Sequence, residues 1–384
     1  MRCNVSSAHG ARGARGARGT RDFRTAHAAI SRRAFVGLSG AALAGLGLAG
    51  CGAYRNAGAP SAGDGTAGDV AASGNGGAGN VGDAGKITFC LDYTPNTNHT
   101  GIYVAQDQGY FADEGLEVEI VQPAEDTAET MLGSGQAQLG ISYQDYIANA
   151  LAGDSPLAIQ AVAAVIQHNT SGIMSRREDA ISSPRMMEGH RYATWDMPVE
   201  QAIIRQVVER DGGDFSKLDL VPYTVDDEVS GLKADMFDDV WVYEGWAVQN
   251  AAVQGYDVSY FSFISIDDVF DYYTPVIAAN NDFCRQHPDV VKAFVRSAKR
   301  GYEYAIANPE PAADILCGQV PELDPALARQ SQLYLAGQYQ ADASHWGMID
   351  ASRWSRFYQW LNDNSLVQNQ LDINAGWTMD YLEA

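Results

Sequence analysis

The region from residue 86 to residue 278 alternates short apolar runs with stretches of mixed polarity. A short apolar run bounded by turn-forming residues is typical of a buried strand, and apolar residues that recur every three or four positions are typical of a helix. The apolar runs predict strands at residues 87–91, 116–120, 139–142, 157–165, 191–195, 219–223 and 240–243. The helical spacing predicts helices at residues 100–109, 126–132, 144–151, 198–210, 229–234 and 245–254. Alternation of this kind indicates βαβ units and a parallel sheet.

After residues 274–278 the pattern becomes helical to the end of the chain. Helices are predicted within residues 288–309 and at residues 325–335 and 352–361. Each of them begins or ends at a proline or a small polar residue. The sequence contains no internal repeat, no transmembrane stretch and no coiled-coil heptads. The C-terminal hundred residues therefore predict a helical return rather than a further domain.

A chain of 384 residues can hold two domains of ordinary size. One α/β block with a second α/β block inserted into it suggests an α/β fold of two lobes joined by a double crossover. The first lobe would hold residues 86–174 and 275–384, and the second residues 175–274. A cleft between two lobes is a frequent place for a small-molecule site.

Residues 1–50 have the features of an export signal. Ser31-Arg32-Arg33 forms a twin-arginine-like signature, and the apolar run at residues 38–49 is too short to span a bilayer as a stable helix. The run ends in Leu48-Ala49-Gly50-Cys51, which resembles the lipobox of bacterial lipoproteins. This resemblance implies that Cys51 is lipidated and becomes the first residue of the mature protein. The alternative is an uncleaved anchor, and the sequence leaves the export route open.

Residues 51–85 consist mostly of Gly, Ala, Asn, Asp and Ser, a composition that predicts a flexible tether. The formal net charge is -22, although residues 1–50 contain eight Arg and a single Asp. The part of the chain after the signal is therefore strongly acidic. A negative net charge disfavours nucleic acid and anionic membrane surfaces as partners.

The sequence predicts no metal site and no cofactor. Its histidines lack the short ligand spacings that zinc needs, and neither a phosphate-binding Gly-rich loop nor a Gly-x-Ser-x-Gly nucleophile motif is present. Apart from Cys3 and Cys51, the cysteines are Cys90, Cys284 and Cys317, an odd number that rules out a complete disulfide framework. Cys284 and Cys317 could pair in an oxidising compartment or remain free.

Four predicted strands end in an aromatic residue with a carboxylate beside or near it. These ends carry Asp92-Tyr93, Ser142-Tyr143 with Asp145, Trp195-Asp196 and Tyr243-Glu244. In open α/β sheets ligands bind at the carboxyl ends of the strands, and two of these ends belong to each predicted lobe. Flat rings suit stacking on a planar ligand, and carboxylates accept hydrogen bonds from its amino groups.

Several of these residues also have a purely structural explanation. Asp145 and Asp196 precede predicted helices and are better explained as N-caps, whereas Glu244 could be either a cap or a ligand contact. His99 could contact a ligand or simply lie at a helix start. Trp241 and Trp246 are more readily explained as core residues. Asp92 is harder to explain as a cap, because Pro95 keeps the next residues extended.

The segment from Leu91 to Gly101, which contains Asp92-Tyr93-Thr94-Pro95-Asn96-Thr97-Asn98-His99, resembles the signature of solute-binding proteins for thiamine pyrimidine precursors. These proteins are components of ABC importers and relatives of the fungal thiamine-pyrimidine synthases. The resemblance continues through Gly109-Tyr110-Phe111, Gly115-Leu116, residues 288–301 and Trp346-Gly347. It implies a two-lobed type II periplasmic-binding-protein fold that closes on its ligand.

By this resemblance Asp92, Tyr93, Asn96 and His99 belong to the pocket, with Trp195, Tyr243 and Glu244 facing them. The family commonly has Trp where this chain has Tyr93, and the cysteine-rich motif of the fungal synthases is missing. The full set of candidate ligand-binding residues is Asp92, Tyr93, Asn96, His99, Ser142, Tyr143, Trp195, Glu200, Tyr243 and Glu244.

The expected function is therefore an exported, lipid-anchored solute-binding protein of an ABC importer. It would capture a planar aminopyrimidine between its lobes and deliver it to a permease that is driven by an ATPase. Alternatives are another small solute, such as a riboflavin-like compound, a sulfonate, nitrate or taurine. An exported enzyme related to the pyrimidine synthases is the rival from a different class.

Overall fold

The computed structural model describes residues 85–123, 127–223 and 227–382. The predicted signal, the lipobox with Cys51 and the tether lie outside the described residues. None of the described helices is both long and apolar enough to cross a membrane.

The first of two five-stranded sheets has the order β2-β1-β3-β10-β4. Its strands are β1 (Lys86–Cys90), β2 (Glu117–Val121), β3 (Leu139–Ser142), β4 (Ile159–Ala164) and β10 (Val276–Asn280). Strands β1, β2 and β3 are parallel, whereas β10 runs antiparallel to β3 and to β4. The sheet is therefore mixed, which corrects the prediction of a parallel sheet.

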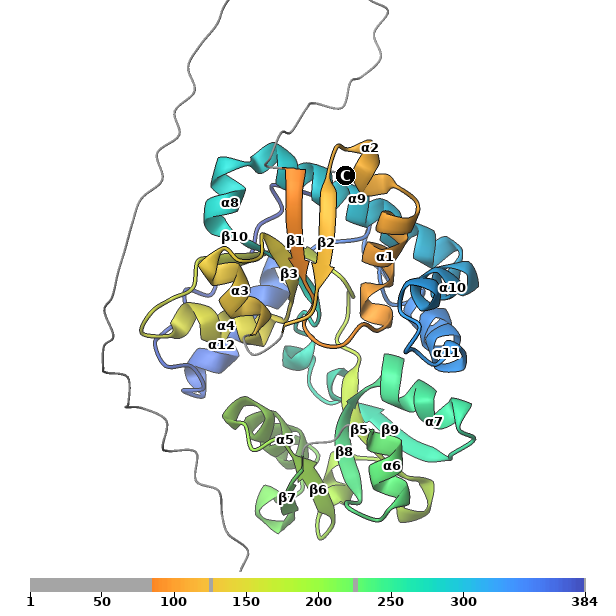
Figure 1. Ribbon diagram of the computed structural model, residues 1–384. Helices are drawn as coiled ribbons and strands as arrows, with labels where there is room; N and C mark the ends of the chain where they lie inside the picture. Colours follow the sequence, from red (N-terminus) through yellow and green to blue (C-terminus); the bar gives the residue numbers. More distant parts are fainter. Residues whose placement is uncertain (1–84, 124–126, 224–226, 383–384) are drawn as a thin grey trace, which may run out of the picture. The chain divides into compact units, whose positions relative to one another are not determined.

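Alternation along β1 divides its side chains between the two faces of this sheet. Ile87, Phe89 and Leu91 pack into a core with α1 (Thr100–Asp107) and α9 (Pro288–Ala307). Cys90 faces the opposite core, which is closed by α3 (Ala128–Ser134), α4 (Gln144–Ala152) and α12 (Ala351–Asp363). Helices cover both faces of the sheet (Figure 1), so only the strand ends remain free for a site.

The second sheet has the order β7-β6-β8-β5-β9. Its strands are β5 (Ser171–Arg176), β6 (Arg191–Thr194), β7 (Asp219–Pro222), β8 (Asp239–Tyr243) and β9 (Val258–Ser262). Strand β5 pairs antiparallel with both β8 and β9. Helix α5 (Pro198–Arg210) packs on one face of this sheet, and α6 (Glu228–Lys233) and α7 (Gln249–Val253) on the other.

The chain passes from the first sheet to the second between β4 and β5, and it returns between β9 and β10. Two lobes joined by a double crossover are the arrangement of the type II periplasmic-binding-protein fold. The predicted lobe boundary at residues 174/175 falls inside β5, and the one at residues 274/275 directly precedes β10.

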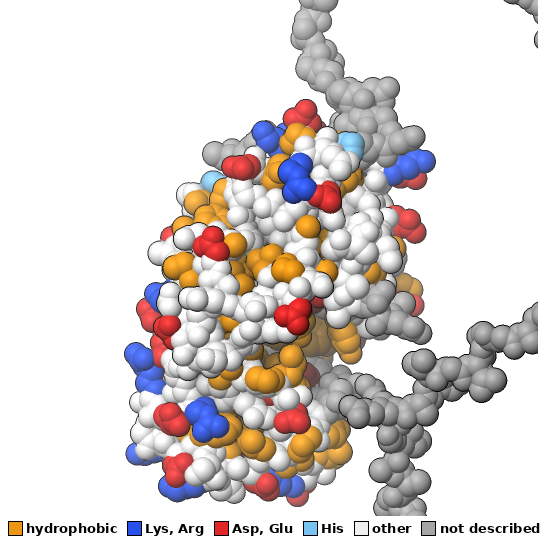
Figure 2. Space-filling view, turned by 90° about the vertical axis from the view of Figure 1, so that its left-hand side faces the viewer, with side chains coloured by type: hydrophobic (Ala, Val, Ile, Leu, Met, Phe, Trp, Pro, Cys, Tyr) orange, Lys and Arg blue, Asp and Glu red, His pale blue; other side chains and the backbone are white. Residues whose placement is uncertain are grey.

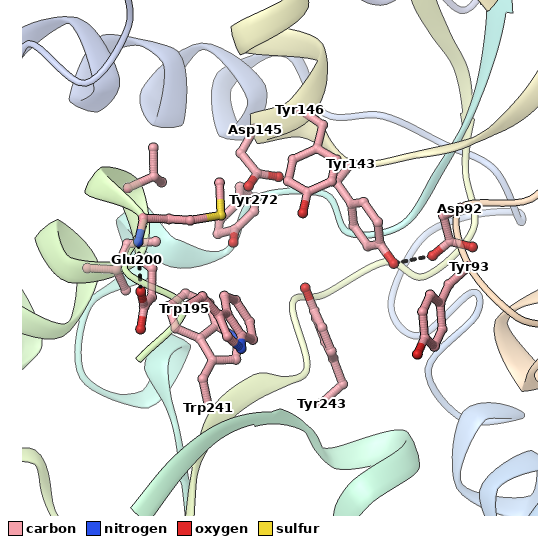
Figure 3. A pocket seen from close by; sticks show the side chains of 13 residues that line it. Asp92, Tyr93, Tyr143, Asp145, Tyr146, Trp195, Glu200, Trp241, Tyr243 and Tyr272 are labelled. Carbon is pink, nitrogen blue, oxygen red and sulfur yellow. Dashed lines mark hydrogen bonds between the residues drawn. The ribbon is translucent and has the colours of Figure 1, made fainter. Parts of the chain in front are cut away.

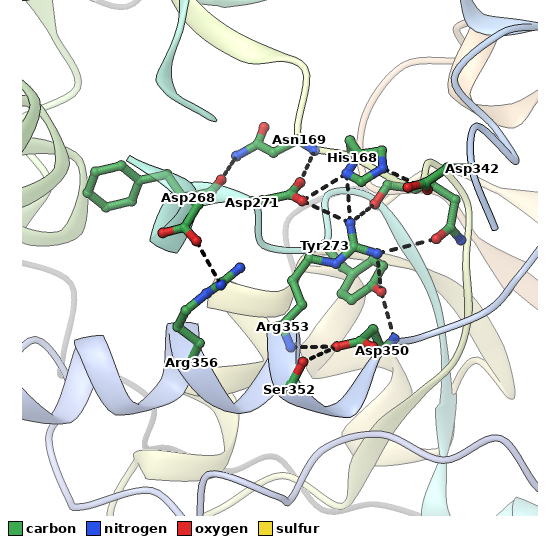
Figure 4. Close-up of polar contacts among 12 residues, drawn as sticks. His168, Asn169, Asp268, Asp271, Tyr273, Asp342, Asp350, Ser352, Arg353 and Arg356 are labelled. Atoms are coloured by element: carbon green, nitrogen blue, oxygen red, sulfur yellow. Dashed lines mark hydrogen bonds and ion pairs between the residues drawn. The ribbon is translucent and has the colours of Figure 1, made fainter. Parts of the chain in front are cut away.

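Helix α12 binds both crossover segments through Arg353. The Arg353 guanidinium donates to the Gln167 carbonyl on the first segment, at 2.6 Å, and to Asp271 on the second, at 3.0 Å. Asp271 also accepts a hydrogen bond from the backbone N–H of Asn169, at 3.0 Å, and pairs with His168 (Figure 4). The two connections between the lobes are thus tied to each other at one place.

The remaining helices include α8 (Asn281–Gln286), α10 (Pro309–Gln319) and α11 (Pro325–Leu335). The close crossing of α1 with α9 depends on two glycines. A Cβ at Gly301 would lie 1.9 Å from the carbonyl oxygen of Gly101, and a Cβ at Gly101 would lie 2.3 Å from the ring of Tyr302. Tyr302 in turn donates to the Asn98 carbonyl at 2.7 Å. This crossing holds the loop that follows β1 in place.

Candidate functional site

A cavity of about 240 Å³ opens where the strand ends of the two sheets face each other (Figure 3). Side chains from both lobes line it. They are Asp92, Tyr93, Tyr143, Asp145, Tyr146 and Tyr272, together with Trp195, Met197, Val199, Glu200, Ile203, Trp241 and Tyr243. Most of this lining is aromatic or aliphatic, and its ionisable groups other than tyrosines are three carboxyls. Such a wall suits a flat, amino-bearing molecule.

Asp92 is the centre of a buried hydrogen-bond chain at one end of the cavity. The backbone N–H of Asn96 donates to His99 Nδ1 at 3.1 Å, so this nitrogen is an acceptor and the ring proton belongs on Nε2. His99 Nε2 lies 2.6 Å from Asp92 Oδ1, and the Tyr143 hydroxyl donates to Asp92 Oδ2. Asp92 therefore orients Tyr143 while still bordering the cavity.

The charge state of Asp92 follows from these contacts. Burial disfavours the charged carboxylate, but the contacts with His99 and the hydrogen bond from Tyr143 outweigh burial, and the pKa of Asp92 lies below its ordinary value. Burial and the Asp92 charge raise the pKa of Tyr143 well above its ordinary value. At neutral pH the pair is a carboxylate that accepts a hydrogen bond from a phenol.

Aromatic rings from both lobes form the walls. Tyr143 and Tyr243 lie with ring centroids 6.4 Å apart and planes inclined by 24°, and Tyr146 meets Tyr143 edge-on at 5.3 Å. On the side of the second sheet, Trp195 lies on Trp241 with centroids 5.3 Å apart. Trp195 is 43% exposed, whereas Trp241 is 3% exposed and its buried Nε1 has no hydrogen-bond partner among the described residues.

Glu200 borders the cavity but is already bonded from three sides. It accepts hydrogen bonds from the Tyr192 hydroxyl at 2.6 Å, from Thr194 Oγ1 at 2.9 Å and from the backbone N–H of Met197 at 3.3 Å. Its position at the start of α5 lets it satisfy the helix end. Glu200 therefore fixes the geometry of the cavity floor.

A second cavity, of about 260 Å³, adjoins the first and shares Asp92, Tyr93, Tyr143 and Tyr243 with it. Its remaining wall is more polar and comprises Thr94, Asn96, Thr97, Asn98, Ile166, Thr170, Glu228, Gly245, Trp246, Thr274, Pro275 and Leu335. Burial raises the pKa of the Glu228 carboxyl to about 7. No Lys or Arg of the described residues lines either cavity.

Seven of the ten predicted site residues line one or both cavities: Asp92, Tyr93, Asn96, Tyr143, Trp195, Glu200 and Tyr243. The other three do not. His99 is fully buried behind Asp92, Ser142 is buried and donates to Glu129, and Glu244 accepts from the Tyr334 hydroxyl at 2.8 Å.

Two capping predictions are wrong. Tyr143 occupies the position before α4, so Asp145 lies inside the helix, and Met197 occupies the position before α5, which leaves Asp196 outside that helix. Trp241, explained from the sequence as core, is buried but also borders the cavity. Tyr146, Met197 and Tyr272 were missed as lining residues. The only sequence signal for Tyr272 is its place in the Tyr-Tyr pair shortly before β10.

The cysteines of the described part of the chain are free thiols: Cys90, Cys284 and Cys317. Burial, together with the nearby Glu129 and Asp92 carboxylates, raises the pKa of Cys90 to about 11. A thiol held protonated in this way is a poor nucleophile. Among the described residues, no cluster of three or more His, Cys, Asp or Glu side chains could hold a metal ion.

The charged side chains on one face of the molecule are mixed in sign. On the face shown in Figure 2, the Lys and Arg side chains lie scattered among acidic ones and do not gather into one patch. Nucleic-acid binding depends on a basic patch or stripe that neutralises phosphates. That face offers no such footprint.

Comparisons with known proteins agree with the geometry. A family model described as NMT1/THI5 like matches residues 96–312. The formylaminopyrimidine-binding protein of Halalkalibacterium halodurans is 30% identical over 285 residues, which cover 72% of this chain and 85% of that protein. The 4-amino-5-hydroxymethyl-2-methylpyrimidine phosphate synthase THI11 of Saccharomyces cerevisiae is 21% identical over 233 residues, covering 58% of this chain and 68% of the synthase.

Among solved structures, the periplasmic aliphatic sulphonate binding protein SsuA from Escherichia coli superposes with a TM-score of 0.60. The superposition covers 75% of this chain and 90% of SsuA, at 14% sequence identity. At this identity the likeness concerns the fold alone.

Proposed function

This chain belongs to the NMT1/THI5-like family, and we propose that it is an extracytoplasmic solute-binding protein of an ABC importer that captures a planar aminopyrimidine. In this proposal the ligand is a precursor of the thiamine pyrimidine, held between the two lobes and passed to a permease. The name of the Halalkalibacterium relative, which binds a formylaminopyrimidine, supports this class of ligand.

The observation that carries the proposal is the chemistry of the cavity walls. Rings from both lobes, among them Tyr143, Trp195 and Tyr243, flank a space that Asp92 and Asp145 supply with acceptor oxygens. A sulfonate or nitrate would need Arg side chains or a similar set of donors, and no Lys or Arg of the described residues lines the space. Flat walls and acidic acceptors favour an aromatic ligand that carries amino groups.

Capture follows from the position of the walls on different lobes. A ligand shifts an opening equilibrium only through contacts that differ between the open and closed states. A ring that touches Tyr143 on one lobe and Trp195 or Tyr243 on the other makes such contacts only when the lobes approach each other. Closing on the ligand would then give the permease a surface that differs from the empty form.

Isothermal titration calorimetry of the purified full-length chain tests this proposal. The panel contains a formylaminopyrimidine, 4-amino-5-hydroxymethyl-2-methylpyrimidine, riboflavin and taurine. We expect saturable one-to-one binding of an aminopyrimidine and none of taurine. Riboflavin would have to occupy the adjoining cavity as well, so tighter binding of riboflavin than of either pyrimidine would replace the proposed ligand. If the protein bound taurine and none of the other compounds, the proposal of an aromatic ligand would be wrong.

We also propose that the protein is a receptor rather than an enzyme, although the yeast relative is named as a synthase. Cys90 does not line the cavity, and its raised pKa makes its thiol a poor nucleophile. Mass spectrometry after prolonged incubation with the bound pyrimidine would return the unchanged compound. Recovery of a modified product in molar excess over the protein would instead identify an enzyme.

Export and a lipid anchor on Cys51 complete the proposal, on the basis of the sequence. Metabolic labelling with an alkyne fatty acid in a bacterial host should mark the wild-type chain and not the Cys51→Ser variant. Labelling of both forms would place the lipid elsewhere. Labelling of neither would favour an unlipidated secreted protein.

A further inference from the structure

Asp145 is a carboxyl group on the cavity wall whose protein contacts are the backbone N–H groups of Asp145 itself and of Tyr146. It is the second residue of α4, and it lines the cavity beside Tyr146 and Tyr272 (Figure 3). No described side chain donates a hydrogen bond to its carboxyl group, in contrast to Asp92 and Glu200, each of which is bonded by two or more donors. The hydrogen-bonding capacity that these backbone groups leave is therefore available to a ligand in the cavity.

The surroundings of Asp145 favour the protonated form of its carboxyl group. Burial disfavours the carboxylate, and the nearby Glu129 charge adds to this effect. Hydrogen bonds from the backbone N–H groups of Asp145 and Tyr146 favour the carboxylate but are outweighed, so the pKa of Asp145 is raised to about 7. The titratable groups around it on the neighbouring elements are acidic or phenolic: Asp92, Glu129, Tyr143, Tyr146, Glu200, Tyr243, Tyr272 and Tyr358. No described cation faces the cavity to hold Asp145 ionised.

A protonated carboxyl group has one donor and one acceptor side by side. The edge of a 4-aminopyrimidine offers the complement, because its ring nitrogen accepts a hydrogen bond and the neighbouring amino group donates one. The two groups can form a pair of parallel hydrogen bonds in one plane, which fixes the ring orientation as well as its position. A bare pyrimidine or a sulfonate cannot form this pair.

We infer that Asp145 is the specificity-determining residue of the cleft, and that it recognises the ring nitrogen and amino group of the ligand through a proton shared in the complex. This inference rests on the proposed function, because it requires an aminopyrimidine in the cavity. It assigns to Asp145 a contact that Asp92, committed to His99 and Tyr143, is less free to make.

The inference makes binding dependent on a proton above neutral pH. Since the complex holds a proton that free Asp145 loses above about pH 7, affinity falls as pH rises, with a limiting slope of about tenfold per pH unit. At lower pH the dependence reverses where the ring nitrogen of the free ligand becomes protonated, because the complex holds only one proton between the two groups. Calorimetry in two buffers of different ionisation enthalpy would measure proton uptake that approaches one per ligand at pH 8.5 and falls as pH is lowered through about 7.

Two substitutions separate this role from a structural one. Asp145→Asn keeps a donor and an acceptor side by side but cannot titrate, so it should bind 4-amino-2-methylpyrimidine within about threefold of wild type at pH 6.5 and lose the fall in affinity above about pH 7. Asp145→Leu keeps the size and removes both groups, so its affinity should fall by about tenfold or more. Asp145→Leu should also lose the preference for this probe over 2-methylpyrimidine. Asp196→Asn is the matched control, since Asp196 is exposed and lines neither cavity.

The outcomes distinguish this inference from the proposed function. If wild type binds no aminopyrimidine at any pH, the proposed function fails and the inference fails with it. If wild type binds but Asp145→Asn keeps the full pH dependence, the shared proton lies elsewhere and the inference alone is overturned. Binding by Asp145→Leu with wild-type affinity and selectivity, in a variant whose circular dichroism matches wild type, would overturn it equally.

Discussion

Tyr143 and Tyr243 face each other across the cleft with ring centroids 6.4 Å apart, although Tyr143 follows β3 of the first sheet and Tyr243 is the last residue of β8 in the second. Their planes differ by only 24°. Tyr143 is fixed by its hydrogen bond to Asp92, whereas the Tyr243 hydroxyl has only a long contact, of 3.4 Å, with Thr274 Oγ1. The pair thus combines a rigid ring on one lobe with a less constrained ring on the other.

This relationship predicts that Tyr243 contributes its ring rather than its hydroxyl to binding. Tyr243→Leu should weaken aminopyrimidine binding by about tenfold, because one stacking face is lost. Tyr243→Phe keeps the face and should stay within about twofold of wild type. Titration calorimetry measures both variants. Wild-type affinity in Tyr243→Leu would show that this ring does not stack on the ligand.

The two tryptophans of the cleft should respond differently to truncation. Trp195 is 43% exposed, so Trp195→Ala should lower the free energy of unfolding by less than about 1 kcal/mol while weakening ligand binding. Trp241 is 3% exposed and also contacts the Phe263 ring, so Trp241→Ala should cost about 3–5 kcal/mol of stability.

Urea denaturation together with ligand titration separates these two effects. Leu333→Ala serves as the control, since Leu333 is exposed on α11 and lines neither cavity. Equal losses of stability in Trp195→Ala and Trp241→Ala would contradict the division of roles. So would unchanged ligand binding in Trp195→Ala.

Elements with strong local signals could be predicted from the sequence. Helices α5 and α11 begin at the proline that the pattern marked and end where it predicted, because proline fits the first helical turn. Strands β5 and β9 were missed, since Ser171–Arg176 and Val258–Ser262 mix polar and apolar residues without a continuous apolar run. Their stability comes from pairing with distant strands, as does the antiparallel direction of β10. Such pairing is not encoded locally.

The candidate site was predictable where one rule applied, namely that ligands bind at strand ends. That rule gave Asp92, Tyr143, Trp195 and Tyr243, which line the cavity, but also Ser142 and Glu244, which do not. It could not find Tyr272, because this residue lies in a crossover segment whose path depends on the packing of two lobes. It also could not show that His99 lies behind Asp92, since only the folded loop reveals which polar groups satisfy each other.

His168 should make stability pH-dependent at the junction of the lobes. Its hydrogen bond to Asp271 raises its pKa, with Asp342 adding to the effect and burial and Arg353 opposing it. A histidine with a raised folded-state pKa adds stability below its unfolded value, near 6.5, and this stability is lost as pH rises through the folded value. His168→Gln should therefore be less stable than wild type by about 1 kcal/mol at pH 6, and the difference should shrink as pH rises through the folded-state pKa.

Denaturant titrations of both proteins across this pH range provide the measurement. His345→Gln is a suitable control, because the His345 ring contacts the Trp346 carbonyl rather than a carboxylate. A constant difference between His168→Gln and wild type from pH 6 to 8.5 would mean that the pairing with Asp271 does not depend on the charge of the ring.

Asp239 is a buried carboxyl group at the start of β8 whose two oxygens have no hydrogen-bond partner among the described residues. Burial, with added repulsion from Asp238 and Asp179, raises its pKa well above the ordinary value. The folded protein thus keeps a proton that the unfolded chain releases above about pH 4, and stability falls as pH rises from there. Asp239→Asn cannot titrate. Its free energy of unfolding should therefore rise relative to that of wild type by up to about 1.4 kcal/mol per pH unit above about pH 4.

Urea denaturation at pH 4.5, 6 and 7.5 tests this expectation, because all other groups contribute equally to both proteins and cancel in the difference. Asp219→Asn is the matched control, as Asp219 is exposed at the start of the adjacent strand β7. Its difference from wild type should stay level over the same range. If the difference in unfolding free energy between Asp239→Asn and wild type did not change with pH, the prediction would be wrong. The ionised Asp239 carboxylate would then have to be stabilised by a partner or by water.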